Sequence, residues 1–276
     1  MPTLNCNISQ SLSDALAARR DRTGETIDHI VVSALADALQ VAHATLFQIS
    51  TAGALVEGVN QGAITVGELM RHGDFGLGTF ADFSGEMVVV DGTTFKVTRQ
   101  GVKLAASSAP VPFAVVTRFV PGKAVDIKKI SSFEDLAVRL DALRNTDNEF
   151  FAVRIDGIFD RIKTRAVRKS DRPASLVDAA SSQAEFQFRD VEGVLVGFWT
   201  PEYIKSLNIV GWHLHFLTAD RSGGGHLLDC QATRLCVQIQ HLADFHMAIP
   251  ETAAFLEADL TRDISHQLAK AEKNHS

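Results

Sequence analysis

Three histidines in the C-terminal third of the chain have the residue type and spacing of metal ligands. His213 and His215 are separated by one residue, and His226 follows after ten more residues that end in a glycine-rich stretch. On a β-strand, side chains at positions i and i+2 point to the same face, so His213 and His215 should lie side by side. A turn near Asp220 would bring the chain back, because glycine accepts the positive φ angles of tight turns. The pattern therefore predicts three imidazoles that converge from one β-hairpin.

Three neutral imidazoles with an open fourth position are the ligand set of a catalytic zinc site, and they also suit other divalent transition metals. A second interpretation is a cupin-like metal oxygenase, in which His213, His215 and Asp220 would form a site of two histidines and one carboxylate. Asp220 is also typical of a turn, and we prefer that role for it. A third interpretation is a metal-binding module without catalytic activity.

Two cysteines near the histidines are predicted to be buried apolar residues. Cys230 follows His226 by four residues, so on a regular strand it would share the face of that histidine. A ligand set that contains cysteine is typical of closed structural sites, and for Cys230 and Cys236 we favour the packing role of a small apolar side chain. With Cys6, the chain has three cysteines in 276 residues. This usage fits a reducing compartment and predicts a cytoplasmic protein.

The segments that must position the histidines are mostly strands joined by glycine turns. β-branched and aromatic residues are concentrated in 46–50, 86–92, 94–99, 113–119, 149–159, 184–191, 193–200, 211–220, 225–231 and 234–242. Asp91 and Gly92, between two of these segments, are a hairpin signal. The run GDFGLGT (73–79) lacks the GK[ST] ending of a phosphate-binding loop, so we interpret it as a strand followed by a turn.

Helices are predicted at 25–43, where apolar residues recur on one face, at 131–144, and at the C-terminal end. Ser131 and Glu134 have the spacing of a capping box. The polar stretch 170–183 is the most linker-like segment. We therefore predict an α+β fold of two mixed or antiparallel sheet regions with a few helices. Residues 1–45 would form an extension with an amphipathic helix, 46–175 an α+β region, and 176–276 a β-rich metal-binding region with closing helices.

The composition argues against several classes of protein. Hydrophobic residues make up 46% of the chain and charged residues 22%, which is the balance of a globular chain and not of a disordered one. The net charge of −6, without a basic block, argues against nucleic-acid binding. No apolar run approaches the roughly 18 residues of a membrane span. The first 25 residues lack the apolar core of a secretory signal.

Three charged residues gain no functional role from the residues alone. Glu86 begins an apolar segment, Arg165 is one cation among several in RIKTRAVRK, and Glu272 lies near the end of the chain in AKAEK. Charged side chains in such contexts are usually exposed to solvent.

The chain resembles the α-acetolactate decarboxylase family from about Leu46 to Glu272. The motifs that carry the resemblance are LFQISTAGALVEGV, GELMRHGDFGLGTF, SGEM, PFAVVTRF, KTRAVRKSDRP, EFQFRDVEGVLVGFWTPEY and GWHLHFLTADRSGGGHLLD. The last motif keeps both the H-x-H pair and the ten-residue gap to the third histidine. Residues 1–45 lie outside the resemblance and inherit no function from it.

The resemblance implies zinc-dependent decarboxylation of 2-acetolactate to (R)-acetoin and carbon dioxide, in a homodimer that takes a small-molecule substrate. An enediolate stabilised by Zn²⁺ would be protonated by an active-site glutamate. The implied site consists of zinc ligands at His213, His215 and His226, carboxylates at Glu86 and Glu272, a substrate-binding and catalytic arginine at Arg165, and a pocket threonine at Thr79.

Overall fold

The computed structural model describes residues 4–24, 26–39, 44–166, 176, 184–262 and 267–268. The chain divides into two compact units, Met1–His43 and Ala44–Ser276. The first unit contains the helices α1 (Gln10–Thr23) and α2 (Ile27–Leu39). The helix predicted at 25–43 is therefore confirmed as α2, whereas α1 was not predicted. The N-cap of α1 is Ser9, whose side chain accepts a hydrogen bond from the Leu12 N–H.

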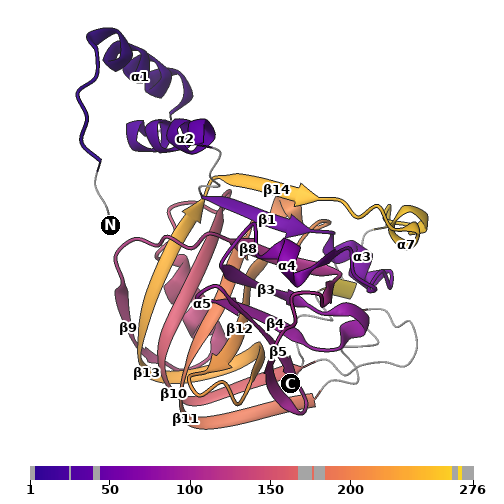
Figure 1. The fold of residues 1–276 in the computed structure, drawn as a ribbon. Coiled ribbons are helices and arrows are strands. Elements are labelled where there is room, and N and C mark those ends of the chain that lie inside the picture. Colours follow the sequence, from indigo (N-terminus) through magenta and orange to yellow (C-terminus); the bar gives the residue numbers. More distant parts are fainter. Residues whose placement is uncertain are drawn as a thin grey trace. The chain divides into compact units, whose positions relative to one another are not determined.

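The larger sheet of the second unit has seven strands, and Figure 1 shows them side by side. In spatial order they are β14 (Asp244–Ala248), β1 (Thr45–Ile49), β8 (Phe113–Thr117), β3 (Phe75–Thr79), β4 (Glu86–Val90), β5 (Thr93–Thr98) and β6 (Gly101–Leu104). Strands β14 and β1 are parallel, and the other neighbours are antiparallel. Asp91 and Gly92 form the predicted hairpin turn between β4 and β5, both with positive φ.

The smaller sheet has five antiparallel strands. They are β10 (Phe150–Ala166), β11 (Ala184–Thr200), β12 (Gly211–Thr218), β13 (Gly224–Leu242) and β9 (Val125–Ile130). Strand β10 also pairs with β13, so β10 to β13 close into a ring. Several predicted segments join here: 184–191 and 193–200 form one strand, as do 225–231 and 234–242.

The two sheets share a hydrophobic core. The seven-stranded sheet contributes side chains such as Leu77 and Val88, and the five-stranded sheet contributes Val196, Phe198 and Leu217. A second core lies on the other side of the five-stranded sheet, where helix α5 (Phe133–Asp141) packs with Leu136 and Leu140. A third core covers the opposite face of the seven-stranded sheet. The α+β architecture with mixed and antiparallel sheets is as predicted.

Short elements complete the second unit. They are α3 (Ala52–Val56), β2 (Ile64–Thr65), α4 (Val66–Leu69), η1 (Ala81–Phe83), β7 (Pro110–Val111), η2 (Glu202–Ile204) and α7 (Ala253–Glu257). The capping prediction for α5 was wrong by one residue, because the N-cap is Ser132, whose side chain accepts from the Asp135 N–H. Ser131 instead donates its own N–H to the Asp135 carboxylate.

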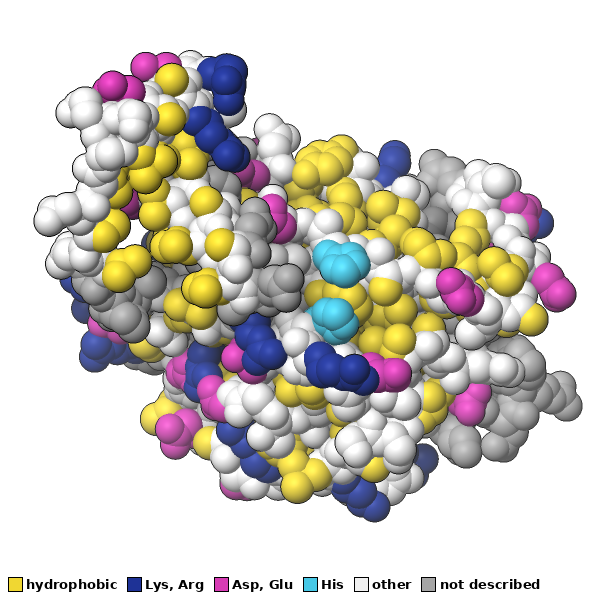
Figure 2. All heavy atoms as spheres, turned by 45° about the horizontal axis from the view of Figure 1, so that its top comes forward, with side chains coloured by type: hydrophobic (Ala, Val, Ile, Leu, Met, Phe, Trp, Pro, Cys, Tyr) yellow, Lys and Arg dark blue, Asp and Glu magenta, His cyan; other side chains and the backbone are white. Residues whose placement is uncertain are grey.

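The linker-like segment 170–183 lies outside the described residues except for residue 176; in the sequence it falls between β10 and β11, which are neighbours in the five-stranded sheet. The division at 175/176 stays a prediction. In the part of the chain that the structure describes, helices fall short of the length and apolar character that a membrane crossing requires. On the face shown in Figure 2, basic and acidic side chains are interspersed and do not gather in one basic area.

Candidate metal centre and active site

The three histidines converge on one face of the β12–β13 hairpin, as predicted. His215 and His226 are direct partners across the two strands, and His213 precedes His215 by two residues on β12. The residues that alternate with them, such as Leu214 and Phe216, belong to the second core. The histidine face therefore points toward the seven-stranded sheet, where Leu217 of the same strand joins the core between the sheets.

The nitrogen atoms of this group have the spacing of ligands around one ion. His213 Nε2 lies 3.2 Å from His215 Nε2 and 3.1 Å from His226 Nδ1. Ligand atoms from the three side chains all lie within 4.8 Å of one another, and all three side chains are buried. Tetrahedral zinc with bonds of about 2.0–2.1 Å has donor atoms about 3.3 Å apart. The donor set therefore fits a divalent transition metal.

A backbone carbonyl of the other sheet sets the tautomer of His215. His215 Nδ1 lies 2.8 Å from the carbonyl oxygen of Met87 in β4. A carbonyl oxygen can only accept a hydrogen bond, so Nδ1 carries the proton and donates it. Nε2 then keeps its lone pair for a metal, which is the usual arrangement of a ligating histidine and its outer partner.

Burial keeps the imidazoles of His213 and His215 in the neutral form that a metal requires. Burial, together with the nearby charge of Arg165, lowers the pKa of His213 from its usual 6.5 to about 3. Burial also holds the pKa of His215 well below its usual value, with further lowering by His213 and Arg165, against the opposing effect of the Met87 carbonyl. At neutral pH both rings therefore present a lone pair without first losing a proton.

Glu86 and Thr79 approach the histidines from the seven-stranded sheet. Glu86 lies on the same face of β4 as Val88 and Val90, which belong to the core between the sheets. Its Oε2 lies 3.7 Å from His215 Nε2, and its side chain is only 8% exposed. Thr79 is the cross-strand partner of Glu86 on β3, is buried, and donates its hydroxyl proton to the Gly85 carbonyl. The structure thus brings both residues to the side of the sheet that faces the histidines.

Arg165 comes from β10 of the five-stranded sheet. It is the cross-strand partner of His226, and only 3% of it is exposed. Partners directly opposite in an antiparallel pair share one face, so Arg165 lies on the histidine face. Its charge lowers the pKa of His213 and of His215. Arg165 and Glu86 were expected at the surface on residue type alone, and both are buried at this centre.

Glu272, the second predicted carboxylate, lies outside the described residues. Its place in the site stays a prediction. The Met87 carbonyl, in contrast, is a functional group that the sequence did not reveal. A backbone oxygen has no residue-type signal, and its role depends on the packing of two sheets against each other.

Cys230 does not share the face of His226. The pairing of β10 with β13 shifts by one residue between Lys163 and Thr164, which is a β-bulge in β13. The bulge reverses the alternation, so Cys230 packs in the second core. Cys230 is buried as predicted, whereas Cys236 is only partly buried, and neither belongs to the group of residues that could hold a metal.

Asp220 is a turn residue, as we preferred. Its Oδ1 accepts hydrogen bonds from the hydroxyl groups of Thr218 and Ser222 at 2.7 Å each, and from the Ser222 N–H at 2.9 Å. The carboxylate is used within the β12–β13 turn and is not part of the three-histidine group. The arrangement therefore gives no support to a site made of His213, His215 and Asp220.

The fold and the site together define a class: an α+β protein with a buried three-histidine centre suited to a metal, placed between two sheets beside a carboxylate and an arginine. The family model described as alpha-acetolactate decarboxylase matches residues 46–262. The alpha-acetolactate decarboxylase of Methanosarcina mazei is 38% identical over 251 residues, covering 90% of this chain and 86% of the relative. That of Methylococcus capsulatus is 40% identical over 229 residues, covering 82% and 88%.

A solved structure agrees with these matches. The crystal structure of alpha-acetolactate decarboxylase from Bacillus subtilis strain 168 superposes with a TM-score of 0.80 at 30% sequence identity, covering 83% of this chain and all of that one. The chain therefore belongs to the α-acetolactate decarboxylase family. It is a decarboxylase, a lyase that breaks a carbon–carbon bond.

Proposed function

We propose that the protein converts 2-acetolactate to (R)-acetoin and carbon dioxide, with Zn²⁺ held by His213, His215 and His226. The observation that carries the proposal is the convergence of three buried imidazoles with Glu86, whose carboxylate lies 3.7 Å from His215 Nε2. The family membership supplies the substrate class. Zn²⁺ at this position would act as a Lewis acid toward the substrate oxygens.

The three histidines leave room for substrate at the metal. They come from one hairpin, and as three protein ligands they would leave a coordination position of the metal to the substrate. The core between the sheets surrounds the site and limits access of water. The paired strands β12 and β13 hold the three imidazoles at fixed positions.

Arg165 binds the negative charge of the substrate. A guanidinium stays protonated at all relevant pH values and offers planar, forked donors to a carboxylate. Its burial beside His226 places a fixed positive charge at the centre of a chain whose net charge is −6. A carboxylate substrate would meet this charge in a site of low dielectric constant, where the attraction is strong.

Glu86 delivers the proton that replaces carbon dioxide. Departure of the carboxylate as carbon dioxide leaves an electron pair on the neighbouring carbon, and acetoin forms when that carbon takes up a proton. Glu86 approaches from the sheet opposite to the histidines, so its proton reaches one face of the carbon and determines the chirality of the product. Thr79, its cross-strand neighbour, lines the same side. Glu272 is the second candidate for this role.

The test uses the purified full-length protein, 2-acetolactate as substrate, and acetoin and bound zinc measured in the same sample. We expect acetoin, about one zinc per chain by the three-ligand argument, and loss of activity with EDTA that zinc restores. Acetoin formation that continues after complete removal of metal would contradict the proposal.

Glu86→Gln tests the proton donor. General acid catalysis contributes about 10²- to 10⁴-fold, so turnover should fall by about 100-fold or more while the zinc content is retained. Glu202→Gln, at an exposed position in η2, is the matched control and should leave turnover unchanged. Unchanged turnover in Glu86→Gln would transfer the role to Glu272, which Glu272→Gln tests in the same assay.

We also infer a homodimer in the cytoplasm. The dimer is what the resemblance to the family implies, and the cytoplasmic location is supported by the free state of Cys6, Cys230 and Cys236. Light scattering on the purified protein should give a mass of twice the 29.9 kDa of one chain.

A further inference from the structure

His213 lies on a part of β12 that is paired on one side only. Among the described residues, β12 pairs with β11 from Gly211 to Thr218, but with β13 only from His215 to Leu217. His215 and His226 therefore each have a neighbouring strand on both sides, whereas His213 has one. Strands twist more where only two of them pair, so the pairing of strands alone fixes His213 less firmly than the other two histidines.

The residue before His213 attaches this part of β12 to a helix. Successive side chains of a strand point to opposite faces, and Trp212 belongs to the second core, behind the histidine face. Its Nε1 donates a hydrogen bond of 2.9 Å to Oδ1 of Asp141, the last residue of α5. Its cross-strand partner is Trp199, and the two ring centres are 5.6 Å apart. The start of β12 is thus tied to α5 through one indole.

Arg144 binds both parts of this contact. Its Nε and Nη2 donate to the same Asp141 Oδ1 at 3.2 and 2.7 Å, and its Cζ lies 3.4 Å from the centre of the Trp199 ring. Its side chain is only 4% exposed. A guanidinium can stack on an aromatic ring and donate forked hydrogen bonds at the same time. Arg144 therefore holds the carboxylate that Trp212 needs and the ring that lies beside Trp212.

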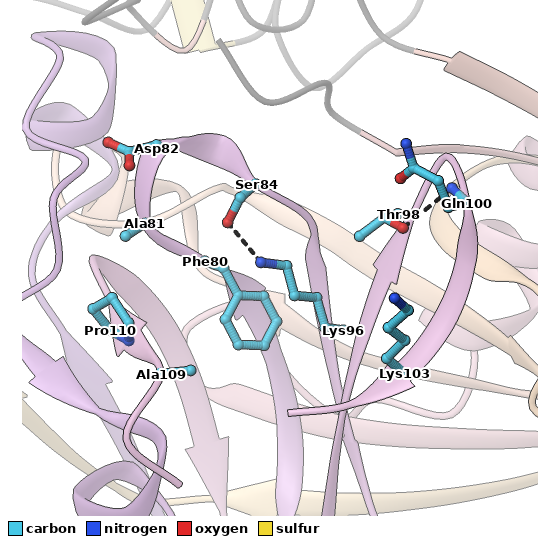
Figure 3. A pocket seen from close by; sticks show the side chains of 10 residues that line it. All are labelled: Phe80, Ala81, Asp82, Ser84, Lys96, Thr98, Gln100, Lys103, Ala109 and Pro110. Carbon is cyan, nitrogen blue, oxygen red and sulfur yellow. Dashed lines mark hydrogen bonds between the residues drawn. The ribbon is translucent and has the colours of Figure 1, made fainter. Parts of the chain in front are cut away.

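The far face of the other sheet is built differently. Behind β5, the neighbour of β4, it opens into a cavity of about 560 Å³ that is lined by residues such as Phe80 and Lys96. Figure 3 shows Lys96 turned toward Ser84 in this cavity, with 2.7 Å between Nζ and Oγ. Behind β12, in contrast, Trp199 and Trp212 fill the space with large rings. The packed backing lies behind the strand that carries the histidines.

We propose that Asp141 and Arg144 are positioning residues for His213. They contact Trp212 and Trp199 on the far face of the sheet, and they act on the ligand through the backbone of β12. This inference rests on the three-histidine metal centre of the proposed function. Without the pair, the start of β12 gains freedom, His213 leaves its place beside the other two rings, and the affinity for metal falls.

The direction of this effect separates positioning from charge. By charge alone, removal of a cation near a metal site would strengthen the binding of a dication, because like charges repel. Positioning predicts the opposite, a weaker affinity when Arg144 is replaced. Arg144→Lys keeps the charge but loses the planar stack, so it should also bind metal more weakly, though less so than Arg144→Met.

The test titrates the metal-free full-length protein with Co²⁺ and follows the visible absorption, which reports the geometry of the donor atoms. The unmodified protein should bind about one Co²⁺ per chain. Arg144→Met and Asp141→Leu should each bind it about 10-fold more weakly, the lower end of what loss of an outer-shell partner costs, with a changed spectrum. Asp141→Asn keeps an oxygen that accepts from Trp212 and should retain most of the affinity.

Two controls separate positioning from general loss of stability. Leu136→Ala removes a buried side chain of the second core from the same helix; it should lower the urea midpoint and leave the affinity and spectrum unchanged. Lys103→Met, at the exposed side of the cavity in Figure 3, should change neither the stability nor the affinity.

Unchanged affinity and spectrum in folded Arg144→Met and Arg144→Lys would overturn the inference. So would an equal change in Leu136→Ala, because the effect would then follow stability. Absence of Co²⁺ binding in the unmodified protein is a separate result, which would contradict the three-histidine centre itself and this inference with it.

Discussion

His213 is the residue on which the metal centre depends most, because both short nitrogen–nitrogen distances of the group start from its Nε2. We predict that His213→Ala loses bound metal and activity together. Loss of an outer-shell partner alone costs about 10- to 100-fold in metal affinity, so removal of a ligand should cost about 100-fold or more. Metal content by mass spectrometry on the purified protein measures the change.

The control for this variant is His241→Ala. His241 lies on β13 beyond the hairpin and pairs with Glu149 at the surface, with a side chain that is 41% exposed. Its replacement should leave the metal content unchanged. One metal per chain retained by His213→Ala would contradict the three-histidine assignment.

Cys230 is expected to be chemically inert in the folded protein. Burial, together with the nearby carboxylates of Asp229, Glu134 and Asp135, raises the pKa of its thiol to about 12. The thiolate is the reactive form, so a disulfide reagent at pH 8 should label the exposed Cys6 quickly and leave Cys230 unlabelled until the chain is unfolded. Cys6→Ser should remove the fast phase. Rapid labelling of Cys230 in the folded Cys6→Ser variant would show that this strand opens.

At the residue scale, strand periodicity predicted that the three histidines converge. It did not predict that Glu86 and Arg165 lie beside them. The H-x-H pair and the third histidine lie on one hairpin, so strand periodicity alone brings them together. Glu86 reaches the histidines from a different sheet. Arg165 lies on strand β10, 61 residues before its cross-strand partner His226 in the sequence. Local sequence does not encode such contacts, so only the family resemblance pointed to these two residues.

The start of strand β13, directly before His226, depends on a glycine. Gly225 has φ +131°, and a Cβ there would lie 2.3 Å from the Arg165 carbonyl oxygen. We predict that Gly225→Ala destabilises the fold by about 2 kcal/mol or more, since strained backbone alone costs about 1–3 kcal/mol, and lowers the metal content. Denaturant unfolding and metal analysis measure both effects.

Gly122→Ala is the matched control, because no atom lies within 4 Å of a Cβ at that position. It should leave stability and metal content nearly unchanged. A Gly225→Ala variant as stable as the Gly122→Ala variant would show that the hairpin accommodates a side chain at 225.

The β12–β13 turn should weaken in acid through Asp220. Its hydrogen bonds with Thr218 and Ser222 lower its pKa from 3.8 to about 2. A carboxyl group with a lowered folded-state pKa adds stability above its unfolded-state pKa, and this contribution is lost as the pH falls from about 4 to about 2. Asp220→Asn should therefore be less stable than the unmodified protein at pH 6, and the difference should shrink toward pH 3. Urea midpoints at the two pH values measure this, with Asp244→Asn, an exposed residue of β14, as control.

At the element scale, the sequence predicted where strands occur better than it predicted how long they are. Residues 149–159 were predicted as a strand, but β10 continues to Ala166 because its charged outer residues alternate with buried ones such as Ile162 and Thr164. The bulge in β13 was not predicted, since a bulge is defined by pairing with another strand. Helix α1 was not predicted because it has no buried residue and thus no apolar periodicity, although Ser9 and Gly24 are its capping signals.

The second unit should fold without the first. All three hydrophobic cores contain, among the described residues, only positions from Leu46 onward, and the family model also begins at residue 46. We predict that deletion of residues 1–43 leaves metal content unchanged and shifts the unfolding temperature by less than about 3 °C, which is roughly 1 kcal/mol for a chain of this size. Calorimetry on the full-length and shortened proteins measures the shift. A large loss of stability would show that α1 and α2 contribute to the core.

The contact between His215 Nδ1 and the Met87 carbonyl has a consequence for how this protein tolerates mutation. Every residue type at position 87 supplies the same carbonyl oxygen, and the side chain there points to the opposite face of β4. Exchange of Met87 for another apolar residue would alter the third core while the imidazole kept its orientation. The orientation of the His215 imidazole therefore does not depend on which residue type occupies position 87. A substitution at this position would change that orientation only if it displaced the backbone of strand β4.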